Sequence, residues 1–207
     1  DREMLFTLYD VWVLKSAAFD HNRVVSWVPI DHSPVPPAVA DFCAKDNVTP
    51  VAMSKFGSAQ LDAKGISNTY IPHAIDTAVM KPTPFITNPH GASKTGRQLM
   101  GGVGDDRFVV GVVNANKGVS PNRKAFGEQL LAFSIFAQDK PDALLYMHTE
   151  KQSSMGGIMF DALIENVGLR EDQYVFVNQY QNRMGIPEDV LACIYSGMDV
   201  LLAATYG

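Results

Sequence analysis

The chain has 207 residues, of which 46% are hydrophobic and 19% are charged, and its formal net charge is −5 at pH 7. This composition is typical of a globular protein with a sizeable core, and the acidic balance excludes a general nucleic-acid-binding surface, so any anion site must be local. Cys43 and Cys193 lack metal-site spacing and are expected to be free thiols in a reducing compartment. We therefore expect a cytoplasmic protein without a transmembrane segment, with peripheral attachment to a membrane left open.

The sequence begins within a helix-like pattern and ends within a strand-like one. DREMLFTLYDVWVLK, at the start, has no initial Met and is interpreted as part of a helix, and the last residues continue an apolar, strand-like run. We therefore expect the chain to be an internal fragment of a longer protein.

Seven apolar runs are strand candidates, and they are nearly continuous rather than alternating. They are residues 24–30, 50–54, 68–73, 108–113, 143–148, 174–177 and 199–204. Such runs are typical of parallel strands covered on both faces. Helical spacing is found between them, at Phe126, Leu130, Phe133 and Phe136, and again within 159–167 and 190–194. The alternation predicts an α/β fold with right-handed crossovers.

Residues 81–106 interrupt this alternation. KPTPFITNPHG is rich in Pro and lacks periodicity, and ASKTGRQLM is compatible with a short helix before the Gly-rich GGVGDD. We place a domain boundary near Phe85, which gives a first domain over 1–84, a linker over 85–107 and a second domain over 108–207.

The loop NANKGVSPNRK follows an apolar strand and carries Lys117, Arg123 and Lys124. Ser120-Pro121 suits the opening of a helix, which predicts Arg123 and Lys124 in the first turn. An exposed cation there faces the positive end of the helix dipole, at a cost of roughly 0.3–1 kcal/mol. A bound anion would make this placement of the cations favourable, because free N–H groups, the helix dipole and the side chains would then all interact with the anion.

Two interpretations of this loop compete. Asn116 and Gly118 suit a loop that aims N–H groups inward at an anion. The alternative is a solvated turn whose cations point into water, and the physics of the loop alone favours neither. Because ligands of parallel sheets bind at the carboxyl ends of the strands, we favour a phosphate site. The GxxxxGK[ST] pattern of a P-loop is absent, and no GxGxxG follows a strand.

Several stretches carry a resemblance to a known family. They are VPIDHSPVPP, VAMSKFG, YIPHAIDT, VVGVVNANKGVSPNRKAFGEQLLAFSIFAQDKPDALLYMHTE, VGLREDQYVFVNQY and MDVLLAATYG. In this order they resemble retaining glycosyltransferases of the family-4 type (glycosyl transferases group 1), which have the GT-B fold. The resemblance implies two incomplete Rossmann-like domains. Residues 1–84 would be the C-terminal part of the acceptor-side domain, and 108–207 the N-terminal part of the nucleotide-sugar domain.

The resemblance also implies roles for residues of the loop. Arg123 and Lys124 would hold the diphosphate of the donor and stabilise charge on the leaving group, a role that metal ions play in other transferases. Asn116, Lys117 and Gly118 would shape the loop beside it. The five histidines show no paired spacing such as HExxH, so no metal and no cofactor other than the nucleotide-sugar donor substrate is expected.

Two further loops follow strands of the second domain. By resemblance, His148 and Thr149 flank the nucleoside on one side, and Gln179 and Tyr180 lie near the base. The alternative for each of Gln179 and Tyr180 is ordinary loop polarity, which we place slightly ahead.

In the first domain, Asp31 and His32 follow an apolar strand. By resemblance they lie at the cleft between the domains, where a carboxylate or imidazole could bind sugar hydroxyls or handle the proton of the acceptor. The strong alternative is that Asp31 caps the Pro-rich turn and the helix from Pro36.

The resemblance thus implies metal-independent transfer of a sugar from a nucleotide-diphospho donor to an acceptor hydroxyl with retention. The sugar, the base and the acceptor (glycan, lipid or protein) stay open. The family's EGFGxPxxE motif would follow Gly207, so we expect little activity from these residues alone. The alternative is a non-catalytic nucleotide- or anion-binding domain, or one that only folds and self-associates. Because incomplete parallel sheets leave edges and apolar faces exposed, we expect a homo-oligomer.

Overall fold

The computed structural model describes residues 3–14, 18–118, 122–153 and 156–205, which form two compact units. Unit 1 comprises Asp1–Ile75 and unit 2 comprises Asp76–Gly207. Both are α/β units built on a four-stranded parallel sheet, which confirms the predicted fold class. No helix in the described part of the chain has the length and apolar character needed to cross a membrane.

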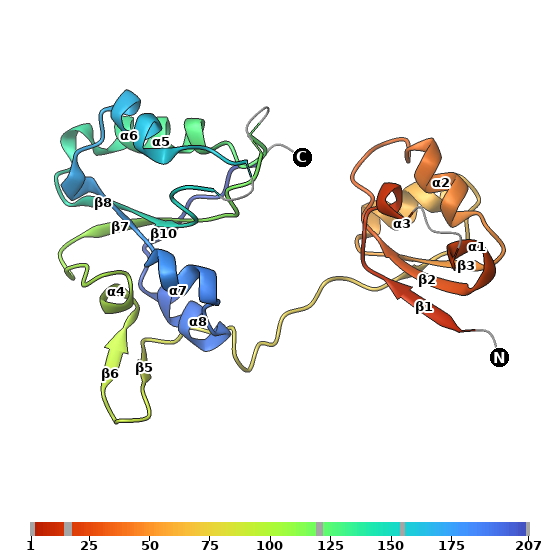
Figure 1. The fold of residues 1–207 in the computed structure, drawn as a ribbon, viewed down its shortest axis with the longest axis horizontal. Coiled ribbons are helices and arrows are strands. Elements are labelled where there is room, and N and C mark those ends of the chain that lie inside the picture. Colours follow the sequence, from red (N-terminus) through yellow and green to blue (C-terminus); the bar gives the residue numbers. More distant parts are fainter. Residues whose placement is uncertain (1–2, 15–17, 119–121, 154–155, 206–207) are drawn as a thin grey trace. The chain divides into compact units, whose positions relative to one another are not determined.

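Unit 1 has the strand order β1-β2-β3-β4, with helices on one side of the sheet (Figure 1). Its strands are β1 (Met4–Thr7), β2 (Arg23–Val28), β3 (Val48–Ala52) and β4 (Thr69–Tyr70). Its helices are η1 (Val11–Val13), α1 (Ala18–His21), α2 (Pro37–Cys43) and α3 (Lys55–Asp62). The core lies between sheet and helices, where Val24 and Val28 meet Val39 and Phe42 of α2.

The helix predicted at the start of the chain is wrong for residues 4–7, which form strand β1. Met4 to Thr7 pair in parallel with Arg23 to Ser26 of β2. Residues alternate along a strand, so Thr7 faces the core while Phe6 lies on the opposite face with 77% of its surface exposed. Pairing with β2 therefore decides the structure here.

Unit 2 has the strand order β10-β7-β8-β9, all parallel. The strands are β7 (Phe108–Val113), β8 (Ala143–His148), β9 (Tyr174–Phe176) and β10 (Val200–Leu201). The bounds predicted for β7 and β8 are confirmed, and the two strands pair from Phe108 with Ala143 to Val113 with His148. The chain passes from β7 to β9 in one direction and returns to the far side of β7, so the strand order reverses between β7 and β10. Ligands of open parallel sheets bind at such a switch point.

Helices cover both faces of the unit 2 sheet (Figure 1). They are α4 (Gly96–Leu99), α5 (Phe126–Phe136), η2 (Ala137–Asp139), α6 (Phe160–Val167), η3 (Glu171–Gln173), α7 (Gln179–Met184) and α8 (Glu188–Ser196). On one face Val112 packs with Phe126 and Phe160 of α5 and α6. On the other face Tyr146 packs with Ile194 of α8.

Residues 85–107, which the sequence indicated as a linker, belong to unit 2. They form an antiparallel hairpin of β5 (Phe85–Thr87) and β6 (Ser93–Thr95), followed by α4. α4 packs so closely on α8 that a Cβ on Gly96 would lie 2.1 Å from the carbonyl oxygen of Cys193. Thr83 N–H also donates to Ser196 Oγ at 2.8 Å. Contacts with α8, far along the sequence, therefore order this Pro-rich segment.

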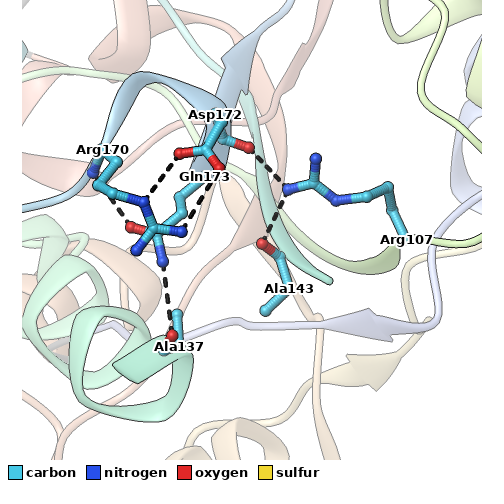
Figure 2. Close-up of polar contacts among 6 residues, drawn as sticks. All are labelled: Arg107, Ala137, Ala143, Arg170, Asp172 and Gln173. Atoms are coloured by element: carbon cyan, nitrogen blue, oxygen red, sulfur yellow. Dashed lines mark hydrogen bonds and ion pairs between the residues drawn. The ribbon is translucent and has the colours of Figure 1, made fainter. Parts of the chain in front are cut away.

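A cluster of polar contacts ties the amino ends of three strands together (Figure 2). The Arg107 guanidinium donates to the backbone carbonyls of Asp142 at 3.0 Å, Ala143 at 3.1 Å and Asp172 at 2.6 Å. These carbonyls lie just before or at the starts of β8 and β9, and Arg107 itself precedes β7. Arg170 forms an exposed ion pair with the Asp172 carboxylate at 3.0 Å. The cluster therefore fixes the end of the sheet opposite the cleft described next.

Candidate functional site

A cleft of about 460 Å³ opens at the carboxyl ends of β7 and β8 in unit 2. The lining comprises residues 113–117 at and after the end of β7, His148 at the end of β8, Glu150 after it, Asn182 from α7 and Leu191 from α8. Parallel strands bring their carboxyl ends to the same end of the sheet, which is why two loops far apart in the sequence meet here. Part of the predicted loop therefore lines a cleft with His148.

The predicted placement of Arg123 and Lys124 in the first turn of a helix is wrong. α5 begins at Phe126, after Ala125, whose φ of 47° is left-handed and interrupts the helical backbone. Asn122 Oδ1 accepts from the N–H of Phe126 at 3.4 Å, so an Asn side chain reaches the helix start. The predicted opening at Ser120-Pro121 lies outside the described residues.

Arg123 and Lys124 lie near the switch point rather than in the lining of the cleft. Arg123 is exposed and Lys124 is half-buried. The Lys124 carbonyl accepts from the side-chain amide of Gln129, which also donates to the carbonyl of Ala204, after β10, at 3.2 Å. Gln129 is buried, and sequence reasoning missed it. Its position on the apolar face of α5 beside Leu130 is the signal that could have found it.

Asn116 holds the two cleft loops together. Its side chain is buried, and its amide donates to the carbonyls of Glu150 at 3.0 Å and Ile158 at 2.8 Å. Its Oδ1 accepts from the N–H of Ile158 at 2.8 Å. The side chain is therefore engaged within the protein. Lys117 is exposed and lines the cleft, and Gly118 adopts a φ of 70°, which favours glycine.

The residues at and after the end of β8 differ in what they offer to a ligand. His148 is half-buried, and burial lowers its pKa; its Nδ1 lies 3.0 Å from the hydroxyl of buried Tyr146. Thr149 is buried, and its Oγ1 has no hydrogen-bond partner among the described residues. Glu150 was left out of the predicted site residues, yet it lines the cleft and lies 3.8 Å from Arg183 Nε in an ion pair.

Gln179 and Tyr180 begin helix α7 rather than lying in a loop. Gln179 Oε1 accepts from the N–H of Lys151 at 2.8 Å, and its Nε2 donates to the carbonyls of Thr149 at 3.1 Å and Val177 at 2.8 Å. The side chain thus clamps the loop after β8 to the end of β9. Tyr180 is 73% exposed and, with Gln179 and Lys151, lines a second hollow of about 330 Å³.

Asp31 and His32 follow β2 in unit 1. Both are exposed, at 68% and 69% of their side-chain surfaces, and His32 Nδ1 lies 2.5 Å from Asp31 Oδ1. After β3 and β4, His73 Nε2 contacts Met53 Sδ at 3.0 Å, and its ring packs 4.7 Å from that of Trp27. In the described part of the chain, no group of three or more His, Cys, Asp or Glu side chains is arranged to hold a metal.

Comparison with known proteins gives matches among solved structures. No family model matches the sequence, and no curated protein does. The OtsA apo structure matches with a TM-score of 0.60 at 12% identity, over 99% of this chain and 52% of that chain. "Trehalose-6-phosphate from E. coli bound with UDP-2-fluoro glucose" matches with a TM-score of 0.61 at 12% identity, over 99% of this chain and 53% of that chain. The chain therefore spans about half the length of these structures. Both are GT-B enzymes, and the likeness shows that the two sheets are Rossmann-like half-domains of the GT-B type.

Proposed function

We propose that the chain is part of a GT-B glycosyltransferase that moves a sugar from a nucleotide-diphospho-sugar to an acceptor hydroxyl with retention. The observation that carries the proposal is the cleft of unit 2. It lies at the carboxyl ends of β7 and β8, beside the switch point, and Lys117 lines it in a chain whose net charge is −5. A structure with this fold has a UDP-sugar analogue bound, which supports a nucleotide-sugar as the ligand.

In this proposal, cations of one loop bind the diphosphate. Lys117 lies at the cleft, and Arg123 and Lys124 follow on the same loop, which is tied at Lys124 to the chain after β10. Side-chain cations placed where charge develops stabilise a departing diphosphate without a metal. Asp31 and His32 would serve the acceptor from unit 1.

Other predicted site residues support this site indirectly. The hydrogen bonds of Asn116 and Gln179 are made to backbone groups of the loop after β8, and Thr149 is buried. We therefore assign Asn116, Gln179 and Thr149 to holding the loops, and leave His148 and Tyr180 as the exposed or half-buried groups beside the nucleoside.

Calorimetric titration with UDP, ADP, GDP and UDP-glucose tests the donor site. We expect one nucleotide to bind the wild-type chain, and Arg123→Ala combined with Lys124→Ala to weaken it by at least about 100-fold, since each hydrogen bond to a charged group contributes about 1.5–3 kcal/mol. Lys117→Ala should weaken binding about tenfold. Lys140→Ala is the matched control, because Lys140 pairs with Asp139 before β8, at the other end of the sheet.

Two results would contradict the donor site: no binding of any of the four nucleotides, or an equal loss of affinity in Lys140→Ala. Hydrolysis of bound UDP-glucose would support catalysis by these residues. Binding without hydrolysis would favour the alternative of a non-catalytic nucleotide-binding domain.

One observation favours self-association as a second candidate function. Phe6 is 77% exposed on the sheet face of unit 1 that faces away from its core, beside half-buried Val25. Burial of this side chain against a second copy would remove apolar surface from water. Sedimentation velocity should detect a dimer that Phe6→Ser weakens, and a wild-type monomer at high concentration would refute this role.

A further inference from the structure

We infer that Tyr146 fixes His148 as the tautomer with hydrogen on Nε2, and that this N–H donates to an oxygen of the nucleoside diphosphate in the cleft. The inference rests on the proposed function and adds a ligand-binding donor and a positioning residue to it. It starts from the contact between the two rings at the end of β8.

The geometry of β8 places both side chains on one face of the sheet. Residues two apart on a strand share a face, and Tyr146 packs there with Val109 and Ile194 while His148 reaches the cleft. Tyr146 is fully buried, its hydroxyl lies 3.0 Å from His148 Nδ1, and the ring centroids are 5.9 Å apart. With Nδ1 engaged, Nε2 is the ring nitrogen that a ligand in the cleft can reach.

The direction of this hydrogen bond follows from what the phenol needs. In the described part of the chain, His148 Nδ1 is the hydrogen-bond partner of the Tyr146 hydroxyl. Burial raises the pKa of Tyr146, so the hydroxyl keeps its proton. If Nδ1 carried a hydrogen, the phenol hydrogen would lack this acceptor, and a buried donor without a partner is destabilising. Nδ1 is therefore the acceptor, and Nε2 carries the hydrogen.

The ring of His148 is uncharged, and the charges of the cleft are carried by other residues. Burial lowers the pKa of His148, so the ring is neutral at pH 7 and acts as a directional donor. Charged groups lining the same cleft are Lys117 from the loop after β7 and Glu150 from the loop after β8. α7 and α8 contribute the uncharged Asn182 and Leu191. A bound anion stabilises the protonated ring, so UDP should raise the pKa of His148.

The tautomer can be measured without ligand by imidazole ¹⁵N NMR of the whole chain at pH 7.5. We expect His148 to show hydrogen on Nε2 in the wild type, and Tyr146→Phe, which keeps the shape of the ring, to lose that preference. The control is Tyr174→Phe, since Tyr174 lies on the opposite face of the sheet and should leave His148 unchanged. Hydrogen on Nδ1 in the wild type overturns the inference.

The ligand contact is measured by UDP titration of the same proteins. We expect Tyr146→Phe to weaken binding about five- to tenfold, as for one hydrogen bond of about 1 kcal/mol. His148→Gln, whose amide reaches the Nε2 position, should retain more affinity than His148→Asn, and UDP should raise the pKa of His148 in the wild type. Wild-type affinity in Tyr146→Phe, or equal loss in both His148 variants, overturns the contact. If the wild type binds none of UDP, ADP, GDP and UDP-glucose, the proposed function falls and the ligand contact falls with it, whereas the tautomer is decided by NMR alone.

Discussion

Replacing Asn116 by Ala should destabilise unit 2 and leave unit 1 unchanged. The substitution removes three hydrogen bonds, two to carbonyls of Glu150 and Ile158 and one from the N–H of Ile158. A buried polar group left without its partner costs about 1–3 kcal/mol. Because Glu150 and Ile158 are only half-buried, part of this cost is relieved by water. We therefore expect a loss of about 2–4 kcal/mol in the free energy of unfolding.

The two tryptophans allow the units to be followed separately. Trp12 and Trp27 both belong to unit 1, so tryptophan fluorescence reports the unfolding of that unit. Far-UV circular dichroism includes unit 2. In urea, a loss of 2–4 kcal/mol at a slope of about 2 kcal/mol per M lowers the unfolding midpoint of unit 2 by about 1–2 M. The fluorescence midpoint should stay constant.

Asn114→Ala is the matched control for this prediction. Asn114 is half-buried on the same loop, and no side-chain hydrogen bond is described for it, so its removal should change the stability of unit 2 by less than about 0.5 kcal/mol. Equal midpoints for the Asn116 and Asn114 variants would refute the view that Asn116 joins the two loops. A shift of the fluorescence midpoint would refute the independence of the units.

Three further predictions concern other parts of the chain. Arg107→Ala should cost unit 2 about 2–3 kcal/mol in urea unfolding, since it removes three hydrogen bonds to backbone carbonyls, whereas Arg170→Ala removes an exposed pair and should change little. Gly96→Ala should destabilise unit 2 by more than about 2 kcal/mol in the same assay, because the added Cβ would clash with backbone atoms. Gly127→Ala in α5 should instead stabilise unit 2 by up to about 0.5–1 kcal/mol, because its added Cβ would have no atom within 4 Å. Burial raises the pKa of Cys43 to about 11, so iodoacetamide should leave this thiol unmodified at pH 8 in the native chain, as read by mass spectrometry, and rapid labelling there would contradict the burial.

The sequence predicted best those strands whose structure depends on burial on both faces. The bounds of β7 and β8 were predicted correctly because their apolar runs begin and end where the buried sheet does. Strand β1 was missed, since its four residues become a strand by pairing with β2, about twenty residues away. The hairpin of β5 and β6 was missed for a similar reason, because contacts with α8 a hundred residues later order it.

The candidate site was predicted in its location and less well in its details. The order of strands and loops was enough to bring Lys117 and His148 to one end of a sheet. The start of α5 was misplaced because Ala125 adopts a left-handed φ, which an alanine in the sequence does not predict. The roles of Asn116 and Gln179 depend on backbone partners in another loop, which a single sequence does not reveal. The contact of Tyr146 with His148 was within reach, since strand alternation puts them on one face.

The Arg107 cluster has a consequence for redesign of this scaffold. It anchors β7, β8 and β9 from the end of the sheet opposite the cleft, so the cleft loops do not have to supply that anchoring. Exchange of those loops would leave the Arg107 hydrogen bonds in place. Because Asn116 joins the segments 114–118 and 150–158, however, a graft must transplant both segments together. The shape of the cleft would then change through paired segments rather than through single residues.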